Sequence, residues 1–213
     1  MNNSIIPGIL EKEWSEIEKK IIQILPVTQN IHIDIIDGKF APSATFLDPA
    51  PFAKYARQAY FELHMMVDEP VNFLKPWAEA GFKRFLGHVE KMSDQAEFVA
   101  QAQLLGEAGL AVDAPTALDA ITVPLSDLDV LLFMTVKTGS SGQQFDSKCL
   151  EKLEKIKELH IPIEVDGGIN EDTIHLAREK GATRFVSTSF IFYSQMPREQ
   201  YIKLNNKLKF KRG

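Results

Sequence analysis

Short apolar runs alternate with amphipathic segments along the whole chain, and this alternation constrains the fold more than any other feature. The runs are rich in Ile, Val, Leu and Phe, as buried strands are, and the segments between them have apolar residues at helical spacing. We expect strands at residues 5–10, 31–36, 60–67, 84–89, 109–112, 129–136, 163–165 and 184–187. We expect helices near residues 13–25, 51–59, 71–80, 94–107, 117–121, 147–158, 171–180 and 198–209.

Strands that alternate with helices pair in parallel, because each crossover needs a helix-length connection. Eight such units in 213 residues match a small (β/α)8 barrel. An open doubly wound sheet would instead carry a Gly-rich turn after its first strand, and Leu10-Glu11-Lys12-Glu13 has no glycine. We find no repeat, linker or break in composition. The sequence therefore predicts the α/β class and a single (β/α)8 TIM barrel domain over residues 1–213.

The composition is that of a soluble globular protein, with 45% hydrophobic residues and a net charge of −5. A negative chain without a clustered basic face gives no reason to expect a nucleic-acid partner. No stretch approaches the roughly 20 apolar residues that span a bilayer, and Met1–Ser4 has no basic residue to begin a secretory signal. The single cysteine, Cys149, excludes an internal disulfide. We expect a cytoplasmic protein that does not bind membranes.

Polar side chains interrupt the apolar runs near the points where the expected strands end. His32 and Asp34 are two residues apart and so share one strand face, His64 is near the end of the third run, and Asp166 ends the seventh. In this fold the chemistry lies at the C-terminal ends of the strands. Two imidazoles and two carboxylates suit a divalent ion. One such histidine would usually be a satisfied interior residue, but four candidates at strand ends favour a metal site. His88 is a possible fifth polar wall residue.

Glycine and serine are concentrated in three loops that follow expected strands. Gly167 and Gly168 follow the seventh strand, and Thr188 and Ser189 follow the eighth. These two loops are a recurrent phosphate cradle in the fold, because glycine lets the backbone approach an anion closely. The loop after the sixth strand has the composition of a plain surface loop or of a mobile lid over a ligand. We favour the lid, which contains Lys137, Gly139, Ser140, Ser141 and Gly142.

From Ile5 to about Phe192 the chain resembles the ribulose-phosphate 3-epimerase family. The resemblance depends on the order and spacing of several motifs together, since none of them is specific alone. These motifs are Ile31-His32-Ile33-Asp34-Ile35-Ile36-Asp37-Gly38-Lys39-Phe40-Ala41-Pro42, Leu63-His64-Met65-Met66-Val67, Met134-Thr135-Val136 and Glu164-Val165-Asp166-Gly167-Gly168-Ile169-Asn170.

The resemblance implies a barrel of the ribulose-phosphate-binding type and a metal-dependent isomerase that forms homo-oligomers. His32, Asp34, His64 and Asp166 would bind one divalent ion (Zn, Fe, Mn or Co). Asp34 and Asp166 would also be the two acid/base groups, with one removing the C3 proton of a ketose phosphate and the other returning a proton to the opposite face. Met66 and Met134 match positions that line the substrate. The implied reaction is that of the pentose phosphate pathway, from D-ribulose 5-phosphate to D-xylulose 5-phosphate.

The chain departs from the family pattern around the substrate rather than at the metal. Gly8 replaces a usual Ser in the first strand, and Ile36 replaces a Met. Lys137 begins a loop that lacks the family's Pro and Phe, Asp113-Ala114 replaces Asn-Pro, and Thr188-Ser189 replaces Gly-Ser. We expect Gly8 to remove one substrate hydrogen bond and Lys137 to add a cation near the substrate.

Three hypotheses remain open from the sequence. The first is the 3-epimerase of D-ribulose 5-phosphate, which the complete set of four candidate ligands supports. The second is a 3-epimerase of another sugar phosphate, such as a ketohexose 6-phosphate, because pocket contacts can change while the catalytic set stays. The third is a barrel that binds a sugar phosphate without catalysis, since a fold alone does not give a function.

Overall fold

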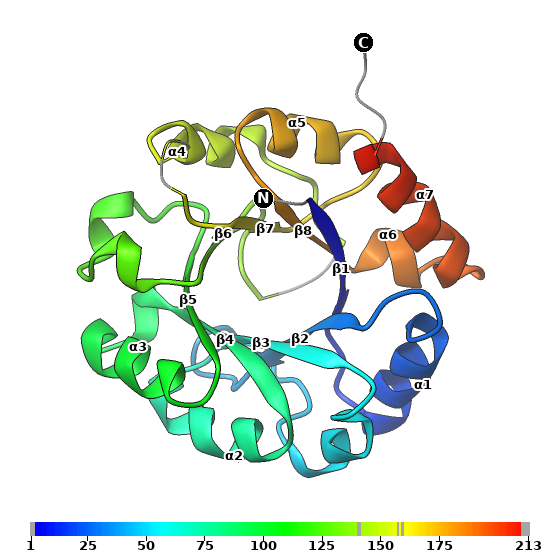
Figure 1. Cartoon of the computed structure of the whole chain (residues 1–213), viewed down its shortest axis with the longest axis horizontal. Coiled ribbons are helices and arrows are strands. Elements are labelled where there is room, and N and C mark those ends of the chain that lie inside the picture. Colours follow the sequence, from blue (N-terminus) through cyan, green and yellow to red (C-terminus); the bar gives the residue numbers. More distant parts are fainter. Residues whose placement is uncertain (1–2, 140–141, 157, 159, 210–213) are drawn as a thin grey trace.

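Eight parallel strands close into one barrel in the order in which they occur along the chain (Figure 1). The computed structural model describes residues 3–139, 142–156, 158 and 160–209. The barrel closes where β8 pairs with β1, so the prediction of a (β/α)8 TIM barrel is confirmed. The strands are β1 (Ser4–Ile9), β2 (Asn30–Ile36), β3 (Tyr60–Met66), β4 (Phe82–His88), β5 (Glu107–Val112), β6 (Val130–Met134), β7 (Ile163–Asp166) and β8 (Arg184–Ser187).

The α-helices form an outer ring and follow one another around the barrel (Figure 1). They are α1 (Trp14–Ile24), α2 (Leu74–Glu79), α3 (Gln95–Gln103), α4 (Glu151–Glu154), α5 (Thr173–Glu179), α6 (Ser189–Phe192) and α7 (Pro197–Lys209). In α1, Ile17, Ile21 and Ile24 are buried. The sequence pattern also puts Ile22 on this face, which is wrong: Ile22 is 53% exposed. It follows Ile21 by one residue and is therefore turned by about 100° around the helix axis.

Several connections are shorter or tighter than the sequence pattern predicts. The expected helix at 51–59 is the 3-10 helix η1 (Ala50–Tyr55), and the one at 117–121 is η4 (Leu118–Ala120). The expected helix at 147–158 consists of η6 (Ser147–Leu150) and the short α4. The remaining 3-10 helices are η2 (Pro70–Phe73), η3 (Val89–Lys91) and η5 (Leu125–Asp127).

The predicted helix at 94–107 is too long at its C-terminal end: α3 ends at Gln103, and β5 begins at Glu107. Gly106 explains the change of direction. A Cβ at this position would lie 2.3 Å from the backbone oxygen of Lys83, so only glycine lets the chain pass there. The close approach leads directly into β5, which pairs with β4.

An aromatic cluster joins β3 and β4 to the helices outside them. Phe52 of η1 contacts Phe61, Trp77 and Phe82, with ring centroids 5.2–5.6 Å apart. Phe61 and Phe82 stack at 5.0 Å on neighbouring strands. All four side chains are almost fully buried. Each such ring stabilises the fold by about 1.5–3 kcal/mol relative to its exposed state, so this cluster holds the strands that carry much of the site.

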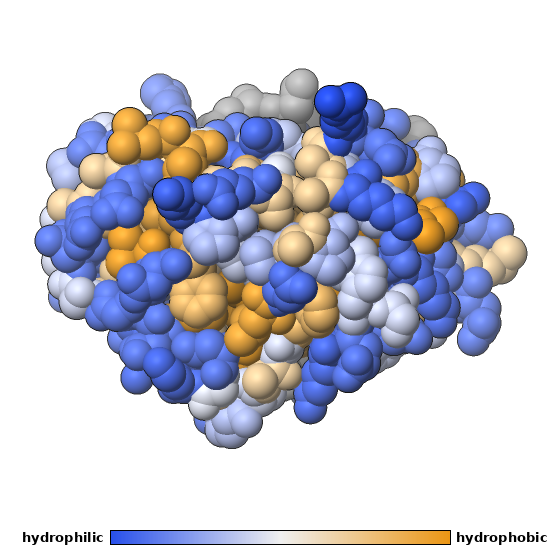
Figure 2. All heavy atoms as spheres, turned by 90° about the horizontal axis from the view of Figure 1, so that it is seen from below, coloured by the Kyte–Doolittle hydropathy of each residue, from blue (hydrophilic) through white to orange (hydrophobic). Residues whose placement is uncertain are grey.

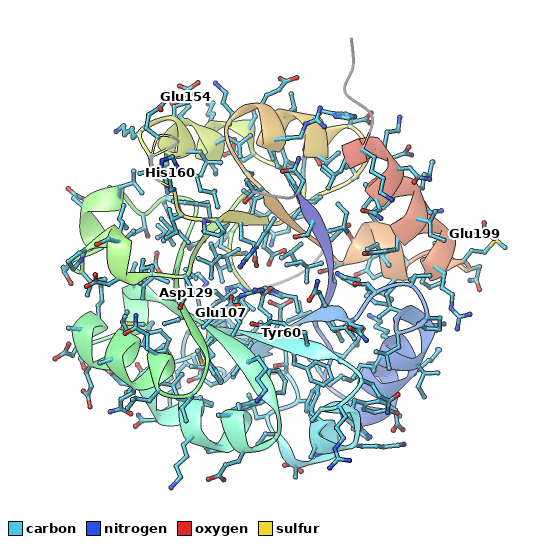
Figure 3. The ribbon with its side chains drawn as sticks, viewed as in Figure 1. Tyr60, Glu107, Asp129, Glu154, His160 and Glu199 are labelled. Atoms are coloured by element: carbon cyan, nitrogen blue, oxygen red, sulfur yellow. The ribbon has the colours of Figure 1, made fainter. Side chains whose placement is uncertain are left out.

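A charged layer lies inside the barrel at the end where the strands begin. Arg84 donates one hydrogen bond to Glu62 (2.5 Å) and another to Glu107 (2.7 Å). Figure 3 labels Glu107 close to Tyr60, near the centre of the ring. Glu164 is fully buried, and neither of its carboxyl oxygens has a hydrogen-bond partner among the described residues. Burial and the negative charge of Glu62 raise the pKa of Glu164 to about 7.

Hydrophilic side chains cover much of one face of the molecule (Figure 2). Figure 2 views the side of the molecule that carries α2 and shows small apolar patches separated by hydrophilic side chains. Within the part of the chain that the structure describes, no helix is long and apolar enough to cross a bilayer. His160, expected only as a loop residue, is exposed at the periphery near α4 (Figure 3).

Candidate metal and catalytic site

Two histidines and two aspartates meet inside the barrel at the end where the strands finish. His32 and Asp34 come from β2, His64 comes from β3, and Asp166 is the last residue of β7. All four are buried, and one ligand atom from each lies within 4.8 Å of the others. The i, i+2 spacing on β2 gives the pair one common face, and the register places Asp34 directly opposite His64. The structure thus brings together the four residues that the sequence singled out.

Glu62 orients the imidazole of His32. The Nδ1 atom of His32 lies 2.6 Å from Oε1 of Glu62, and the other oxygen of Glu62 accepts a hydrogen bond from Arg84. Arg84 and His32 hold the pKa of Glu62 well below its usual range despite its burial, so Glu62 is an acceptor. Nδ1 of His32 therefore carries a proton. The remaining nitrogen, Nε2, faces Oδ1 of Asp34 at 3.2 Å.

His88 and Glu90 orient the second imidazole. Burial holds the pKa of His88 below its usual value, so its ring is neutral at pH 7. Nδ1 of His88 donates to Oε2 of Glu90 at 2.9 Å, which leaves Nε2 of His88 as an acceptor. Nε2 of His64 lies 2.9 Å from that atom and is therefore the donor. Nδ1 of His64 then presents its lone pair to Oδ1 of Asp34 at 2.7 Å.

These hydrogen bonds fit a cation at the centre of the cluster. The free nitrogens of His32 and His64 both point at Oδ1 of Asp34, so acceptor atoms face one another. Such an arrangement is stable only with a positive charge between the atoms, either a proton or a metal ion. Burial lowers the pKa of His32, yet the negative charge of Asp34 outweighs burial and holds it well above its usual range. The buried cluster of two histidines and two aspartates could therefore hold a divalent ion.

The two carboxyl groups have unequal surroundings. Burial favours the neutral form of Asp34, but the charges and hydrogen bonds of His32 and His64 hold its pKa well below the usual range. For Asp166, burial and the negative charge of Asp34 raise the pKa to about 6. The nearest imidazole nitrogen, Nδ1 of His64, is 3.8 Å from Oδ2 of Asp166. Asp166 thus interacts more weakly with the histidines than Asp34 does.

A cavity of about 40 Å³ lies over this cluster and is lined by Asp34 and Asp166. Its walls contain two methionines, several glycines and the two polar residues that follow β8. The lining residues that the sequence had predicted for the substrate site are Met66, Met134, Gly139, Gly142, Gly167, Gly168, Thr188 and Ser189.

Known proteins resemble this chain over nearly its full length. The family model described as "Ribulose-phosphate 3 epimerase family" matches residues 4–192. The chain belongs to the ribulose-phosphate 3-epimerase family. One relative is the ribulose-phosphate 3-epimerase of Schizosaccharomyces pombe, which is 30% identical over 95% of this chain and 92% of its own length. Another, from Mycobacterium tuberculosis, is 30% identical over 91% of this chain and 87% of its own.

Solved structures with low identity support the fold of this family member. KGPDC from Streptococcus mutans has a TM-score of 0.74 and 13% identity, and covers 100% of this chain and 99% of its own. The 3-hexulose-6-phosphate synthase of Salmonella typhimurium has a TM-score of 0.68 and 14% identity, and covers 96% of this chain and 98% of its own. At this level of identity the likeness concerns the barrel alone.

Some residues that the sequence assigned to the substrate site lie elsewhere in this family member. Lys137 is exposed and lines a neighbouring hollow with Asp113 and Lys148, not the cavity over the cluster. Gly8 lies beside Thr188 and does not itself line that cavity. Ser140 and Ser141 lie outside the described residues. The roles expected for Lys137 and for the loop around it stay predictions.

Three supporting residues received no role from the sequence. Glu62 and Glu90 orient the two histidines, as described above. Thr135 is fully buried, and its hydroxyl donates to the backbone oxygens of Asp166 (3.0 Å) and Gly167 (2.5 Å), which holds the end of β7. The turn that follows needs glycine, because Gly167 has a φ of 119° and Gly168 a φ of 64°. The sequence signals Thr135 only as a polar residue directly after the apolar run of β6.

Proposed function

We propose that this chain is a metal-dependent 3-epimerase that interconverts D-ribulose 5-phosphate and D-xylulose 5-phosphate. The observation that carries the proposal is the pair of carboxyl groups, Asp34 and Asp166, on the wall of one cavity beside a buried pair of histidines. Membership in the ribulose-phosphate 3-epimerase family supports this reaction over the two alternatives, another sugar phosphate or binding without catalysis.

In the proposed mechanism the two carboxyl groups act from different sides of the substrate. Asp34 is on β2 and Asp166 on β7, and β8 and β1 separate these strands in the ring. One carboxylate takes the proton from C3, and the other carboxyl group delivers a proton to the opposite face, which inverts the centre. A divalent ion held by His32, Asp34, His64 and Asp166 would stabilise the negative charge that develops on the carbonyl oxygen. Zn, Fe, Mn and Co all suit this ligand set.

The other cavity residues bind and shield the substrate in this proposal. Met66 and Met134 form an apolar wall that excludes water from the reacting carbons. The backbone around Gly168 and Ser189 contacts the phosphate, because the left-handed glycine turn exposes N–H groups at close approach. Lys137 adds a cation near the phosphate in this proposal; an unchanged Michaelis constant in Lys137→Ala would remove this residue from the site.

Exchange of the C3 proton in heavy water tests the proposal directly. Purified protein is mixed with D-ribulose 5-phosphate and Mn²⁺, Fe²⁺ or Zn²⁺, and the reaction is followed by NMR. We expect deuterium at C3 together with formation of D-xylulose 5-phosphate. Asp34→Asn should abolish both with the fold intact, whereas the matched control Asp127→Asn, which changes an exposed aspartate in η5, should not. Folded protein that shows no exchange with any of these ions would contradict the proposal.

We further propose one domain over residues 1–213, a cytoplasmic location and a homo-oligomeric state, with no nucleic-acid or membrane partner. The net charge of −5 supports the absence of a nucleic-acid partner. Light scattering coupled to gel filtration measures the mass of the assembly, and a mass of one chain at micromolar concentration would contradict the homo-oligomer.

A further inference from the structure

Asp113 holds the start of the loop that follows β6. It is the first residue after β5, and β5 and β6 are neighbours in the ring (Figure 1). One oxygen of its carboxylate, Oδ1, accepts hydrogen bonds from the hydroxyl of Thr138 (2.5 Å), the backbone N–H of Thr138 (3.3 Å) and the backbone N–H of Ala114 (2.8 Å). Hydrogen bonds to a carboxylate are stronger than those between neutral groups. A side chain of one loop therefore holds the backbone of the next.

The backbone around Asp113 is itself fixed from two sides. On the helix side, the ammonium group of Lys152 in α4 donates to three backbone oxygens of this loop, those of Asp113 (3.0 Å), Ala114 (2.6 Å) and Thr116. An ammonium group has three donors, so these oxygens use all of them. On the strand side, the backbone N–H of Asp113 donates to Oε1 of Glu90 at 2.7 Å. These contacts give the Asp113 carboxylate a fixed place.

Glu90 connects this loop to the metal cluster. Its other oxygen, Oε2, accepts a hydrogen bond from His88 at 2.9 Å, and His88 in turn accepts one from His64 at 2.9 Å. One carboxylate therefore orients the imidazole behind a candidate ligand and also the backbone of Asp113. A continuous series of hydrogen bonds runs from His64 to Thr138 through these residues.

Thr138 lies next to the wall of the cavity over the cluster. Val136, two residues before it, and Gly139, directly after it, both line this cavity. The backbone oxygen of Gly139 accepts a hydrogen bond from Ser43 at 2.9 Å, and a Cβ at position 139 would lie only 2.9 Å from Cβ of Ala41. Because the wall is this tightly placed and the cavity measures only about 40 Å³, a shift of Thr138 changes the space for a ligand.

A purely local role for Asp113 would need only its contact with Ala114, which is an ordinary turn contact. The two contacts with Thr138 join residues that are 25 positions apart and belong to no local turn. Asp113 does not itself line the cavity over the cluster. It can therefore affect a ligand there only through the backbone that it holds.

We infer that Asp113 is a positioning residue for the proposed reaction, and that its carboxylate, acting through Thr138, holds the cavity wall formed by Val136 and Gly139. The inference rests on the proposed function and deepens it, since this wall belongs to the cavity proposed for the ketose phosphate. Asp113 has no contact with Asp34 or Asp166 among the described residues, so it serves binding rather than proton transfer.

Asp113→Ala removes the acceptor of Thr138 and leaves every residue that lines the cavity unchanged. We expect the Kd and the KM for D-ribulose 5-phosphate to rise about tenfold, with kcat within about threefold. In protein without substrate, the Thr138 amide should exchange with solvent about tenfold faster by NMR, because its hydrogen bond is lost. Asp113→Asn keeps an acceptor oxygen in the same place and should return all these values to within about threefold of the wild type.

The matched control is Asp119→Ala, which changes an exposed aspartate in η4, within the same connection between β5 and β6. It should leave the Kd and the Thr138 exchange rate within about twofold of the wild type. If the Thr138 amide of Asp113→Ala also exchanges within about twofold of the wild-type rate, the inference is overturned. A Kd within about twofold of the wild type in Asp113→Ala overturns it as well.

Thr138→Val tests the route of the effect, because valine keeps the shape of threonine without its hydroxyl. Alone, it should raise the Kd about fivefold, and Thr138→Ser should restore it. Added to Asp113→Ala, it should have no further effect, since the hydroxyl has already lost its acceptor. If the two effects multiply in the double variant, Asp113 does not act through Thr138 and the inference is overturned. Should Asp113→Ala fail to fold, a Kd ratio for Thr138→Val below about two overturns the inference and a ratio of about five supports it.

Calorimetric titration with D-ribulose 5-phosphate separates this inference from the proposed reaction. If the wild type binds the compound but shows no C3 exchange, the proposed epimerase activity fails, and the ratio of Kd between Asp113→Ala and wild type still decides the role of Asp113. A ratio of about ten supports the inference, and a ratio below about two overturns it. A wild type that does not bind D-ribulose 5-phosphate overturns both proposals.

Discussion

Arg84→Met should lower the stability of the barrel by about 3–5 kcal/mol, because it leaves a buried carboxylate without its cation. The Arg84 and Glu62 side chains are 9% and 1% exposed, and their charged atoms are 2.5 Å apart. The second partner of Arg84, Glu107, is 40% exposed and regains water when the arginine is lost. The cost therefore arises mainly at Glu62. Methionine keeps most of the apolar stem of arginine, so the replacement mainly removes the charge.

For a chain of this length, 1 kcal/mol corresponds to roughly 2–4 °C, so the melting temperature of Arg84→Met should fall by about 6–20 °C. Thermal unfolding followed by circular dichroism measures this change. The matched control is Lys54→Met, which breaks the ion pair of Lys54 with Glu18 at the surface, where the lysine side chain is 65% exposed. Exposed pairs contribute about 0–1 kcal/mol, so the control should shift the melting temperature little.

The double variant Arg84→Met with Glu62→Gln distinguishes an unpaired charge from lost packing. Removing both charges of a buried pair is often close to neutral, so the double variant should recover most of the lost stability. If Arg84→Met costs less than the Lys54→Met control, or if the double variant is as unstable as Arg84→Met alone, the electrostatic reasoning is refuted.

Three further predictions concern the metal site, the β5 turn and the thiol. Glu62→Gln should weaken binding of Mn²⁺ or Zn²⁺ by about 10–100-fold in calorimetry, because the hydrogen bond that orients His32 is weakened, whereas Glu107→Gln should not. Gly106→Ala should cost about 1–3 kcal/mol in urea unfolding, since its Cβ would meet a backbone oxygen; unchanged stability would contradict this close approach. Burial raises the pKa of the Cys149 thiol, so at pH 7 a thiol reagent should label folded protein more slowly than urea-unfolded protein, and labelling should accelerate as the pH rises. Equal labelling rates would refute the burial.

The sequence predicted the order of strands and helices well, because each element carries its own local hydrophobic period. The sequence predicted the ends and buried faces of elements less accurately where tertiary packing determines them. The start of β5 at Glu107 depends on the close passage of Gly106 over Lys83, which no local pattern reveals. The exposure of Ile22 depends on how wide the buried stripe of α1 is.

The four candidate ligands were found from the sequence because each occupies a strand end, a position that the fold itself defines. Contacts between distant residues were not found. A Cβ at position 8 would lie 2.3 Å from Oγ1 of Thr188, and this closeness follows from the β1–β8 register, which no local pattern reveals. The placement of Lys137 beside a neighbouring hollow depends on the path of its loop.

The four candidate metal ligands come from strands in both halves of the sequence, so the affinity for a divalent ion depends on whether the barrel is closed. β2 and β3 supply His32, Asp34 and His64, and β3 and β4 with η3 supply the partners that orient both imidazoles. The first half of the chain therefore contains three of the four candidate ligands, while Asp166 joins them only when β7 takes its place. An intermediate in which the second half of the barrel is unfolded would offer three ligands. Titration of a divalent ion during refolding would then report the moment at which the ring becomes complete.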